Sequence, residues 1–231
     1  MQFGCWWIHE RLQEDTLDYY DWRNAVFNQP IRDLADADYE SDAFFLSLDE
    51  AFDHIDRALM DDGLYSFKKE QLVIGFSLIF GKTFTDYSWC YTRLPKDRRI
   101  RGILNLRLLY SRYFLKYCSP HYLDIPGHLV DPLSMDHLCF NFWDRFCLFP
   151  TAEGGPRATH AVLDVMESAL ALPNDNIIVA VVETLCFWTY VRKDLEIDRP
   201  ATVLGSWLAN PKTKNIAVVA ICKQMIDSSL T

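Results

Sequence analysis

Apolar residues recur every three or four positions along most of the chain, and this helical spacing predicts a largely α-helical protein. The clearest case is the segment 48–60, where the apolar residues recur every three or four positions until Asp61, Asp62 and Gly63 end the run. By the same criterion we predict helices over residues 6–27, 68–80, 100–117 and 134–149. Residues 68–80 contain β-branched residues that would suit a strand, but their length favours a helix.

The last third of the chain repeats itself. Leu170-Ala171-Leu172-Pro173 recurs thirty-eight residues later as Leu208-Ala209-Asn210-Pro211. The same register pairs Val165 with Val203, Ile178 with Ile216, and Val181 with Val219. Repeats of about 40 residues made of two amphipathic helices are typical of HEAT-like and armadillo-like stacks. We therefore predict an all-α fold, a HEAT/armadillo-like stack of antiparallel helical hairpins.

Residues 158–228 are predicted to form two such hairpins. The first helix ends at Pro173, the second covers residues 177–188 and the third covers residues 200–208. The fourth helix begins after Thr213, its predicted N-cap, and runs to about Ile226. The residues expected on the inner faces are Val165, Met166, Leu170, Val181, Leu185, Trp207 and Leu208.

Length and composition favour one helical domain over residues 1–231, with the helical repeats at 134–231. Half of the 231 residues are hydrophobic and 14% are aromatic, so a sizeable core is available. The seven cysteines are scattered through apolar segments, which is typical of reduced, buried thiols. The N-terminus lacks the pattern of a signal peptide, and the apolar runs are shorter than the ~18 residues of a membrane span. We expect a cytoplasmic protein that does not enter a membrane.

Charge is distributed unevenly. Residues 1–62 form an acidic N-terminal segment with sixteen Asp and Glu against four Arg, a net charge of −12, whereas the remaining residues total +3. Such a segment suits docking to a basic partner, although it would equally suit a solvated face that keeps the protein soluble. The partner-binding residues that we predict are an acidic cluster and two aromatic anchors: Asp36, Asp38, Glu40, Asp42, Trp6 and Trp7.

Basic residues gather between residues 93 and 116, where eight Lys and Arg accompany the single acid Asp97. The interleaved Tyr91, Tyr110, Tyr113 and Tyr117 could serve as stacking platforms for nucleic acid. Because the protein as a whole is acidic, we favour a different interpretation, in which this segment neutralises the acidic N-terminal segment within the same molecule.

No motif in the sequence indicates catalysis or a cofactor. The densest His and Cys group is Cys118, His121, His128, His137, Cys139 and Cys147. Its spacings are poor for zinc, so we expect packing thiols and solvated histidines, and no bound metal. Asp53-His54 and Asp136-His137 reverse the His-Asp order of metal-dependent phosphohydrolases. Walker A, GxSxG, HExxH and GxGxxG motifs are missing. We therefore expect a protein that is not an enzyme.

Residues 139–188 resemble the C-terminal region of a group of uncharacterised bacterial HEAT-like proteins. The similar segments are Cys139-Phe140-Asn141-Phe142-Trp143-Asp144, the helix Ala161 to Met166 with its Leu-Asp-Val-Met sequence, and a closing Trp188. Where that group carries two histidines before its Trp, this chain has Glu183 and Phe187, so we expect the last segment to be a packing element only.

Members of this group are often suspected of being immunity or accessory factors of secreted toxins, so the resemblance implies a non-enzymatic partner-binding protein. We expect a cytoplasmic immunity protein that neutralises a cognate toxin by direct, charge-complementary binding. Two alternatives remain open at this point. One is a scaffold or adaptor helical-repeat protein, and the other is a nucleic-acid-binding helical repeat that uses the basic residues 93–116.

Overall fold

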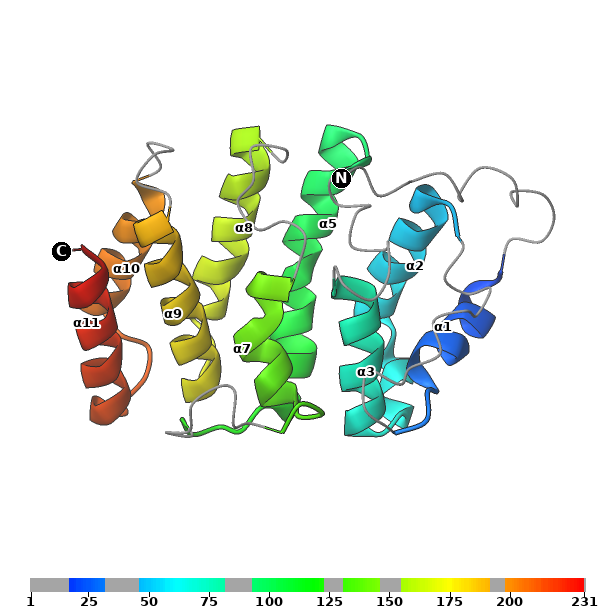
Figure 1. The fold of residues 1–231 in the computed structure, drawn as a ribbon, viewed down its shortest axis with the longest axis horizontal. Coiled ribbons are helices and arrows are strands. Elements are labelled where there is room, and N and C mark those ends of the chain that lie inside the picture. The colour runs from blue at the N-terminus through cyan, green and yellow to red at the C-terminus, as the bar shows by residue number, and fades with distance from the viewer. Residues whose placement is uncertain are drawn as a thin grey trace, which may run out of the picture.

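The structure is a computed structural model that describes residues 17–31, 46–81, 93–122, 131–145, 155–191 and 198–230. Every regular element in these ranges is a helix, which confirms the all-α prediction (Figure 1). The elements are α1 (Tyr19–Phe27), α2 (Leu48–Met60), η3 (Asp62–Ser66), α3 (Lys69–Phe80), α5 (Lys96–Leu108), η5 (Leu109–Phe114), α6 (Leu115–Tyr117), α7 (Met135–Arg145), α8 (Gly155–Ala169), α9 (Asp175–Val191), α10 (Arg199–Ala209) and α11 (Ile216–Leu230).

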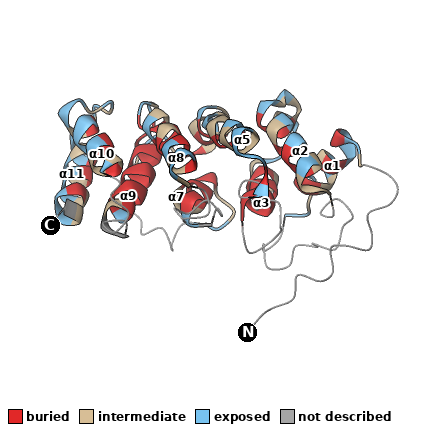
Figure 2. Cartoon of the chain, turned by 90° about the horizontal axis from the view of Figure 1, so that it is seen from above, coloured by how far each residue is buried: buried red, intermediate tan, exposed pale blue. Residues whose placement is uncertain are grey.

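The long helices lie in two rows (Figure 2). The first row contains α2, α5, α8 and α10, and the second row contains α3, α7, α9 and α11, with α1 packed against α2 and α3 at one end. From α7 onward each successive helix belongs to the other row. Within the second row α9 packs against both α7 and α11, and across the rows it contacts α8 and α10.

Sequence patterns set the helix boundaries. Helix α2 begins at a capping box, in which the Glu50 N–H donates to the Ser47 hydroxyl and the Ser47 N–H donates to the Glu50 carboxylate. It has the bounds 48–60 that the apolar periodicity predicts. Helix α1 also lies within a predicted helix, with Tyr19, Trp22 and Val26 buried; residues 6–16 of that prediction lie outside the described residues.

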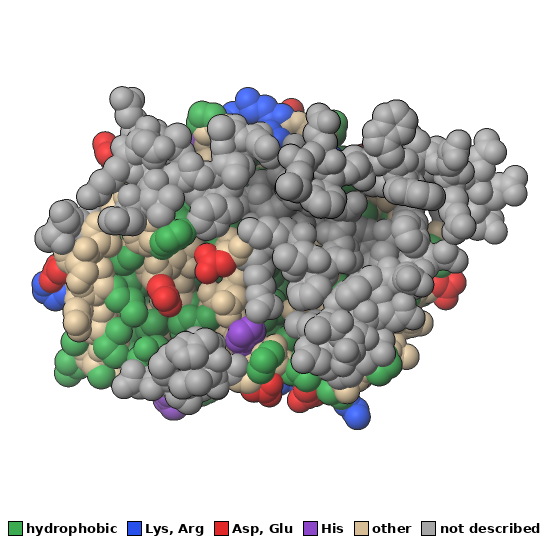
Figure 3. All heavy atoms as spheres, viewed as in Figure 1, with side chains coloured by type: hydrophobic (Ala, Val, Ile, Leu, Met, Phe, Trp, Pro, Cys, Tyr) green, Lys and Arg blue, Asp and Glu red, His purple; other side chains and the backbone are tan. Residues whose placement is uncertain are grey.

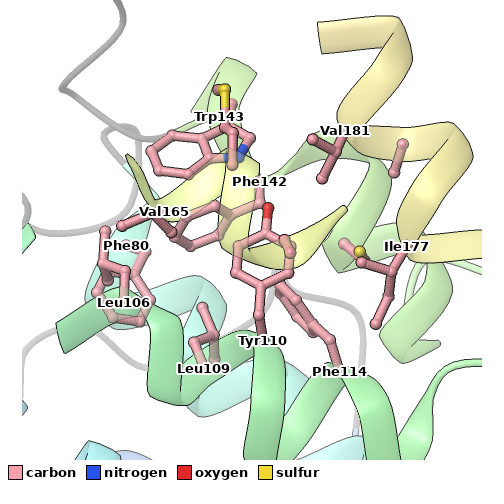
Figure 4. Packing of buried hydrophobic residues seen from close by; sticks show 14 of the residues in the cluster. Phe80, Leu106, Leu109, Tyr110, Phe114, Phe142, Trp143, Val165, Ile177 and Val181 are labelled. Carbon is pink, nitrogen blue, oxygen red and sulfur yellow. The ribbon is translucent and has the colours of Figure 1, made fainter. Parts of the chain in front are cut away.

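One continuous cluster of buried side chains extends from Tyr19 to Ile226. At its centre, Phe142 of α7 points between residues from α3 and η5 (Figure 4). Its ring centroid lies 5.4 Å from that of Phe80 and 6.0 Å from that of Phe114, both in edge-to-face arrangements. Trp143 stacks on Tyr110 with the two ring planes 18° apart. Aromatic packing therefore joins the two rows where α3, η5 and α7 meet.

The predicted inner-face residues are buried, apart from Leu208, which is half-buried against the core. Trp207 is 5% exposed, and residues 177–182 form part of helix α9 rather than a strand. These observations confirm the predicted helices of the last third.

The repeat register needs a correction in its second helix. Val165 and Val203 are both buried, as the 38-residue register requires, but Ile216 is 84% exposed where Ile178 is fully buried. The buried residues of α11 are Val218, Cys222 and Ile226, which follow the buried Ile177, Val181 and Leu185 of α9 by 41 residues. The longer chain before α11 shifts its buried stripe by three residues relative to the sequence repeat.

The predicted N-cap at Thr213 is also wrong, because α11 begins two residues later than a Thr213 cap would place it. Asn215 is the capping residue, and its side-chain carbonyl accepts the Ala217 N–H at 3.1 Å. Thr213 instead donates its hydroxyl to the buried carboxylate of Asp175 at 2.6 Å. It therefore joins the start of α11 to the start of α9.

Asparagine and serine side chains cap the N-termini of the last three second-row helices. Ser134 accepts the His137 N–H at 3.1 Å, and Asn174 accepts the Ile177 N–H at 3.0 Å. Together with Asn215, these caps lie 40 and 41 residues apart along the chain. The three helices consequently begin at equivalent places along the row.

Candidate protein-binding surfaces

The six predicted partner-binding residues all lie outside the described residues. They are Asp36, Asp38, Glu40, Asp42, Trp6 and Trp7. Their role in partner binding stays a prediction.

The described part of the acidic segment contacts the basic segment directly. Arg98 of α5 forms ion pairs with Asp49 and Asp53 of α2, and Arg112 of η5 forms one with Asp62. The hydrogen bond to Asp53 is the main cause that raises the pKa of Arg98. The guanidinium of Arg98 also lies 5.0 Å from the centroid of the Phe52 ring. The expected neutralisation within the molecule is confirmed for these two arginines.

Two of the four tyrosines of the basic segment are poorly placed for stacking on bases; Tyr117 is half-buried, and Tyr91 lies outside the described residues. Tyr110 and Tyr113 are buried in the core, and the Tyr113 hydroxyl donates to the backbone carbonyls of Ala58 and Asp61. Burial raises the pKa of both phenols above the ordinary value of tyrosine. Lys116 lies 3.7 Å above the ring of Tyr65. The two buried rings therefore offer no face to a nucleic acid.

The described members of the His and Cys group are not gathered around a common point. Cys118 and Cys139 are both buried, and burial is the main cause that raises the pKa of Cys118. His121 is exposed, and His128 and Cys147 lie outside the described residues. Within the described ranges, no three or more His, Cys, Asp or Glu side chains are grouped to hold a metal ion. The two thiols serve as small core residues.

Asp136 has a structural role instead of the phosphohydrolase role that we set aside from its sequence. Its carboxylate is buried and accepts hydrogen bonds from the Ser119 N–H at 2.8 Å, from the Ser119 hydroxyl at 2.9 Å and from the Asn176 side chain at 3.0 Å. It thus joins the connection after α6 to the first turns of α7 and α9.

The second-row face, defined as the solvent-facing side of α7, α9 and α11, combines apolar side chains with carboxylates among its described residues. Its exposed positions on α9 are Glu183 and, one turn later, Phe187, which is 45% exposed. On α7 the exposed carboxylate is Asp144, one turn after the half-buried Phe140. Figure 3 shows hydrophobic and acidic side chains side by side on the left of this face.

Burial in these apolar surroundings raises the pKa of Glu183, and the negative charge of Asp144 raises it further. Cys186 of α9 is buried, and burial raises the pKa of its thiol. The burial of most of this segment supports the prediction that it is a packing element. Trp188 is buried, as expected, but Glu183 and Phe187 face solvent because the helix packs through its other sides.

A surface depression on α11 does not have the form of a small-molecule site. It is lined by Ala220, Lys223, Gln224, Asp227 and Ser228, and so by a single helix, and it is open to solvent. Small-molecule sites are usually enclosed by several elements. The broader second-row face is the stronger candidate for recognition.

The comparisons with known proteins give no further guide to the site. No protein family, no curated protein and no solved structure matches this chain. Within the described ranges, no helix is both long enough and apolar enough to cross a membrane.

Proposed function

We propose that this chain is a HEAT/armadillo-like helical-repeat protein that acts by binding another protein and not by catalysis. One observation carries the proposal: successive helices alternate between two rows, and the caps of α7, α9 and α11 recur at 40 and 41 residues. Stacks built from units of this length present extended surfaces that typically bind macromolecules.

More specifically, we propose a cytoplasmic immunity protein that neutralises a cognate toxin by direct binding. The net charge of −9 suits a partner with a basic surface. The resemblance of residues 139–188 to the suspected immunity proteins supports the same assignment. In this proposal Asp36, Asp38, Glu40 and Asp42 steer the encounter, and Trp6 and Trp7 anchor the complex.

A nucleic-acid partner is less well supported. Two of the arginines on which it would depend form ion pairs, Arg98 with α2 and Arg112 with Asp62 of η3, and two of the tyrosines are buried. A scaffold role would also need a protein-binding surface, but it would not require the partner to be inactivated.

Co-expression with the product of the neighbouring gene tests the proposal. The chain should abolish the toxicity of that product in growing cells and form a stoichiometric complex with it in size-exclusion chromatography. A complex that leaves the partner active would favour a scaffold and contradict the immunity assignment. Salt-sensitive binding of RNA or DNA, without any protein complex, would contradict both.

A further inference from the structure

Helix α11 is the open end of the second row (Figure 1). The preceding helix of that row, α9, packs between α7 and α11, whereas α11 packs against α9 and α10, and no further helix follows it among the described residues. Three buried positions of α9 are Val179, Val182 and Cys186. Their equivalents on α11, which come 41 residues later, are exposed: Ala220, Lys223 and Asp227. The end of the row thus leaves uncovered the positions that are covered on α9.

The side of α11 that faces away from the core is apolar over its first half. We define the α11 stripe as its exposed residues at helical spacing: Ile216, Ala217, Ala220, Gln224 and Asp227. Ile216 is 84% exposed, the largest value among the exposed large hydrophobic side chains of the described residues. The outer face of a terminal repeat is normally polar, because the stack itself offers nothing to cover it. An apolar stripe at this position therefore indicates that another helix packs on it.

The charges on either side of Ala220 have opposite signs. Lys214 lies six residues before Ala220 and Asp227 lies seven residues after it, and both are exposed. In an antiparallel pair of α11 helices centred on Ala220, Lys214 of each copy faces Asp227 of the other. Asp227 already forms an ion pair with Lys223, but both side chains of that pair are exposed, so it contributes little and leaves Asp227 able to accept a second cation.

We propose that the α11 stripe is a homodimer interface, in which α11 of one copy packs antiparallel on α11 of a second copy around a two-fold axis at Ala220. Such an interface brings the same surface of both copies together, so the stripe must complement itself, and its charges do. Ala220 lies in the open surface depression of this helix, and its small side chain lets the second helix approach closely. Ile216 and Ala217 then pack against the Gln224 turn of the other copy.

This inference goes beyond the proposed function and does not depend on it, because it requires no toxin. The charges at this end of the molecule favour a second copy over a basic protein. Residues 199–230 carry four Lys and Arg against Asp227 alone, so a basic surface would be repelled here. Helices α1 and α2, which belong to the acidic segment, lie at the opposite end of the molecule (Figure 1). A dimer through α11 therefore keeps those helices of the two copies far apart.

The first test is the mass of the full chain in sedimentation velocity over a range of concentrations. Two single helices form a small interface, so we expect a reversible dimer with a Kd on the order of 10 µM. Ile216→Lys should weaken dimerisation about tenfold or more, and Ala220→Lys should abolish it, because two lysines would meet at the two-fold axis. Met60→Lys makes the same change at a 53% exposed residue of α2, so it should dimerise as the parent does.

The second test exchanges the charges that face each other across the interface. Lys214→Asp and Asp227→Lys should each be largely monomeric, because each sets like charges opposite one another. An equimolar mixture of these two variants should form a heterodimer, since every facing pair is then of opposite charge. The double variant, with both exchanges in one chain, should recover the dimerisation of the parent. Circular dichroism verifies that each variant is folded.

Several results would overturn the proposal. They are a parent that stays monomeric at about 1 mM, equal effects of Ile216→Lys and Met60→Lys, and a mixture of the two charge variants that associates no better than either alone. If the parent stays monomeric but Ile216→Lys abolishes its complex with the toxin, the α11 stripe belongs to the protein partner. Salt-sensitive binding of a DNA or RNA probe by the monomer, lost in Lys214→Asp, would assign it to a nucleic acid and contradict the dimer too.

Discussion

Asp136 on α7 and Asn176 on α9 are joined by a hydrogen bond of 3.0 Å between two buried side chains. The Asn176 amide donates to the carboxylate and also donates to the Ser119 carbonyl at 3.1 Å. Since Ser119 itself donates twice to Asp136, the three residues form a closed polar cluster. This cluster sets the position of α7 relative to α9, and so the geometry of the second-row face.

Asp136→Ala should lower the free energy of unfolding by about 2–4 kcal/mol, because it leaves the buried Asn176 amide and the half-buried donors of Ser119 without their acceptor. Asp136→Asn keeps one carbonyl acceptor and should cost less. Chemical denaturation measures both effects. The exposed Asp198, whose side chain does not cap α10, provides the control, and Asp198→Ala should change stability by less than about 0.5 kcal/mol. Equal effects at the two positions would contradict the structural role of Asp136.

Trp207→Ala should cost roughly 3–5 kcal/mol, because Trp207 is a large side chain buried between α10 and the core. The neighbouring Ser206 is exposed, so Ser206→Ala should leave the unfolding midpoint nearly unchanged. A loss below about 1 kcal/mol for Trp207→Ala would show that the end of the stack contributes little to the cooperative core.

Two helical glycines should respond in opposite directions to alanine. Gly205 on α10 is exposed, and a Cβ there would meet no atom within 4 Å. Gly205→Ala should therefore stabilise the protein by about 0.5–1 kcal/mol. At Gly75 on α3 a Cβ would lie 2.2 Å from Cδ1 of Phe27, so Gly75→Ala should destabilise by at least about 1–3 kcal/mol. Thermal unfolding of both variants checks the contrast in sign.

The helices could be predicted from the sequence because their apolar stripes are strong. The bounds of α2 follow from Leu48, Phe52, Ile55 and Leu59, and the capping box at Ser47 supports the same start. The position of α11 could not be predicted as well. The similarity of Leu208-Ala209-Asn210-Pro211 to residues 170–173 fixes a register for the end of α10, but the length of the following connection decides where the next helix begins.

The exposed residues of the second-row face were harder to predict from the sequence. Glu183 stands out in the sequence only as a departure from a family pattern, and periodicity places it on an apolar helix. The pKa of Glu183 is raised in part by Asp144, which is thirty-nine residues away in the sequence and approaches only when α7 and α9 pack together. The exposure of Phe187 likewise depends on which side of α9 is covered by its neighbours, and a single sequence does not contain that information.

Asp61 should give the protein a stability that depends on pH at the acidic end. Burial alone would raise its pKa, but hydrogen bonds from the Tyr19 hydroxyl at 2.7 Å, the Gly63 N–H at 2.7 Å and Arg23 at 3.0 Å lower it overall. A carboxyl with a lowered folded-state pKa stabilises the protein above its unfolded pKa of about 3.9, and this contribution is lost as pH falls through the folded-state pKa.

Asp61→Asn should therefore reduce stability at pH 7 and flatten the decline in stability below about pH 4. The neighbouring Asp62 makes an ion pair with Arg112 but its side chain is 88% exposed, so Asp62→Asn should have a much smaller effect. Urea unfolding across the acidic pH range distinguishes the two. Parallel pH profiles for the parent and Asp61→Asn would contradict the assignment.

The acidic cluster Asp36, Asp38, Glu40 and Asp42 should govern how fast the partner associates. Charges at the rim of an interface mainly accelerate the encounter, and salt screens them over about 10 Å at 0.1 M ionic strength. Changing the four acids together to Lys should slow association with the toxin by about tenfold or more at low salt and flatten its salt dependence. The dissociation rate and the helical circular dichroism signal should stay unchanged. Neutral Asn and Gln at the same positions should produce a smaller decrease.

If the Lys variant associated as fast as the parent at low salt, these acids would form only a solvated surface. The docking contacts would then have to be provided by other parts of the molecule, with the second-row face as the first place to examine.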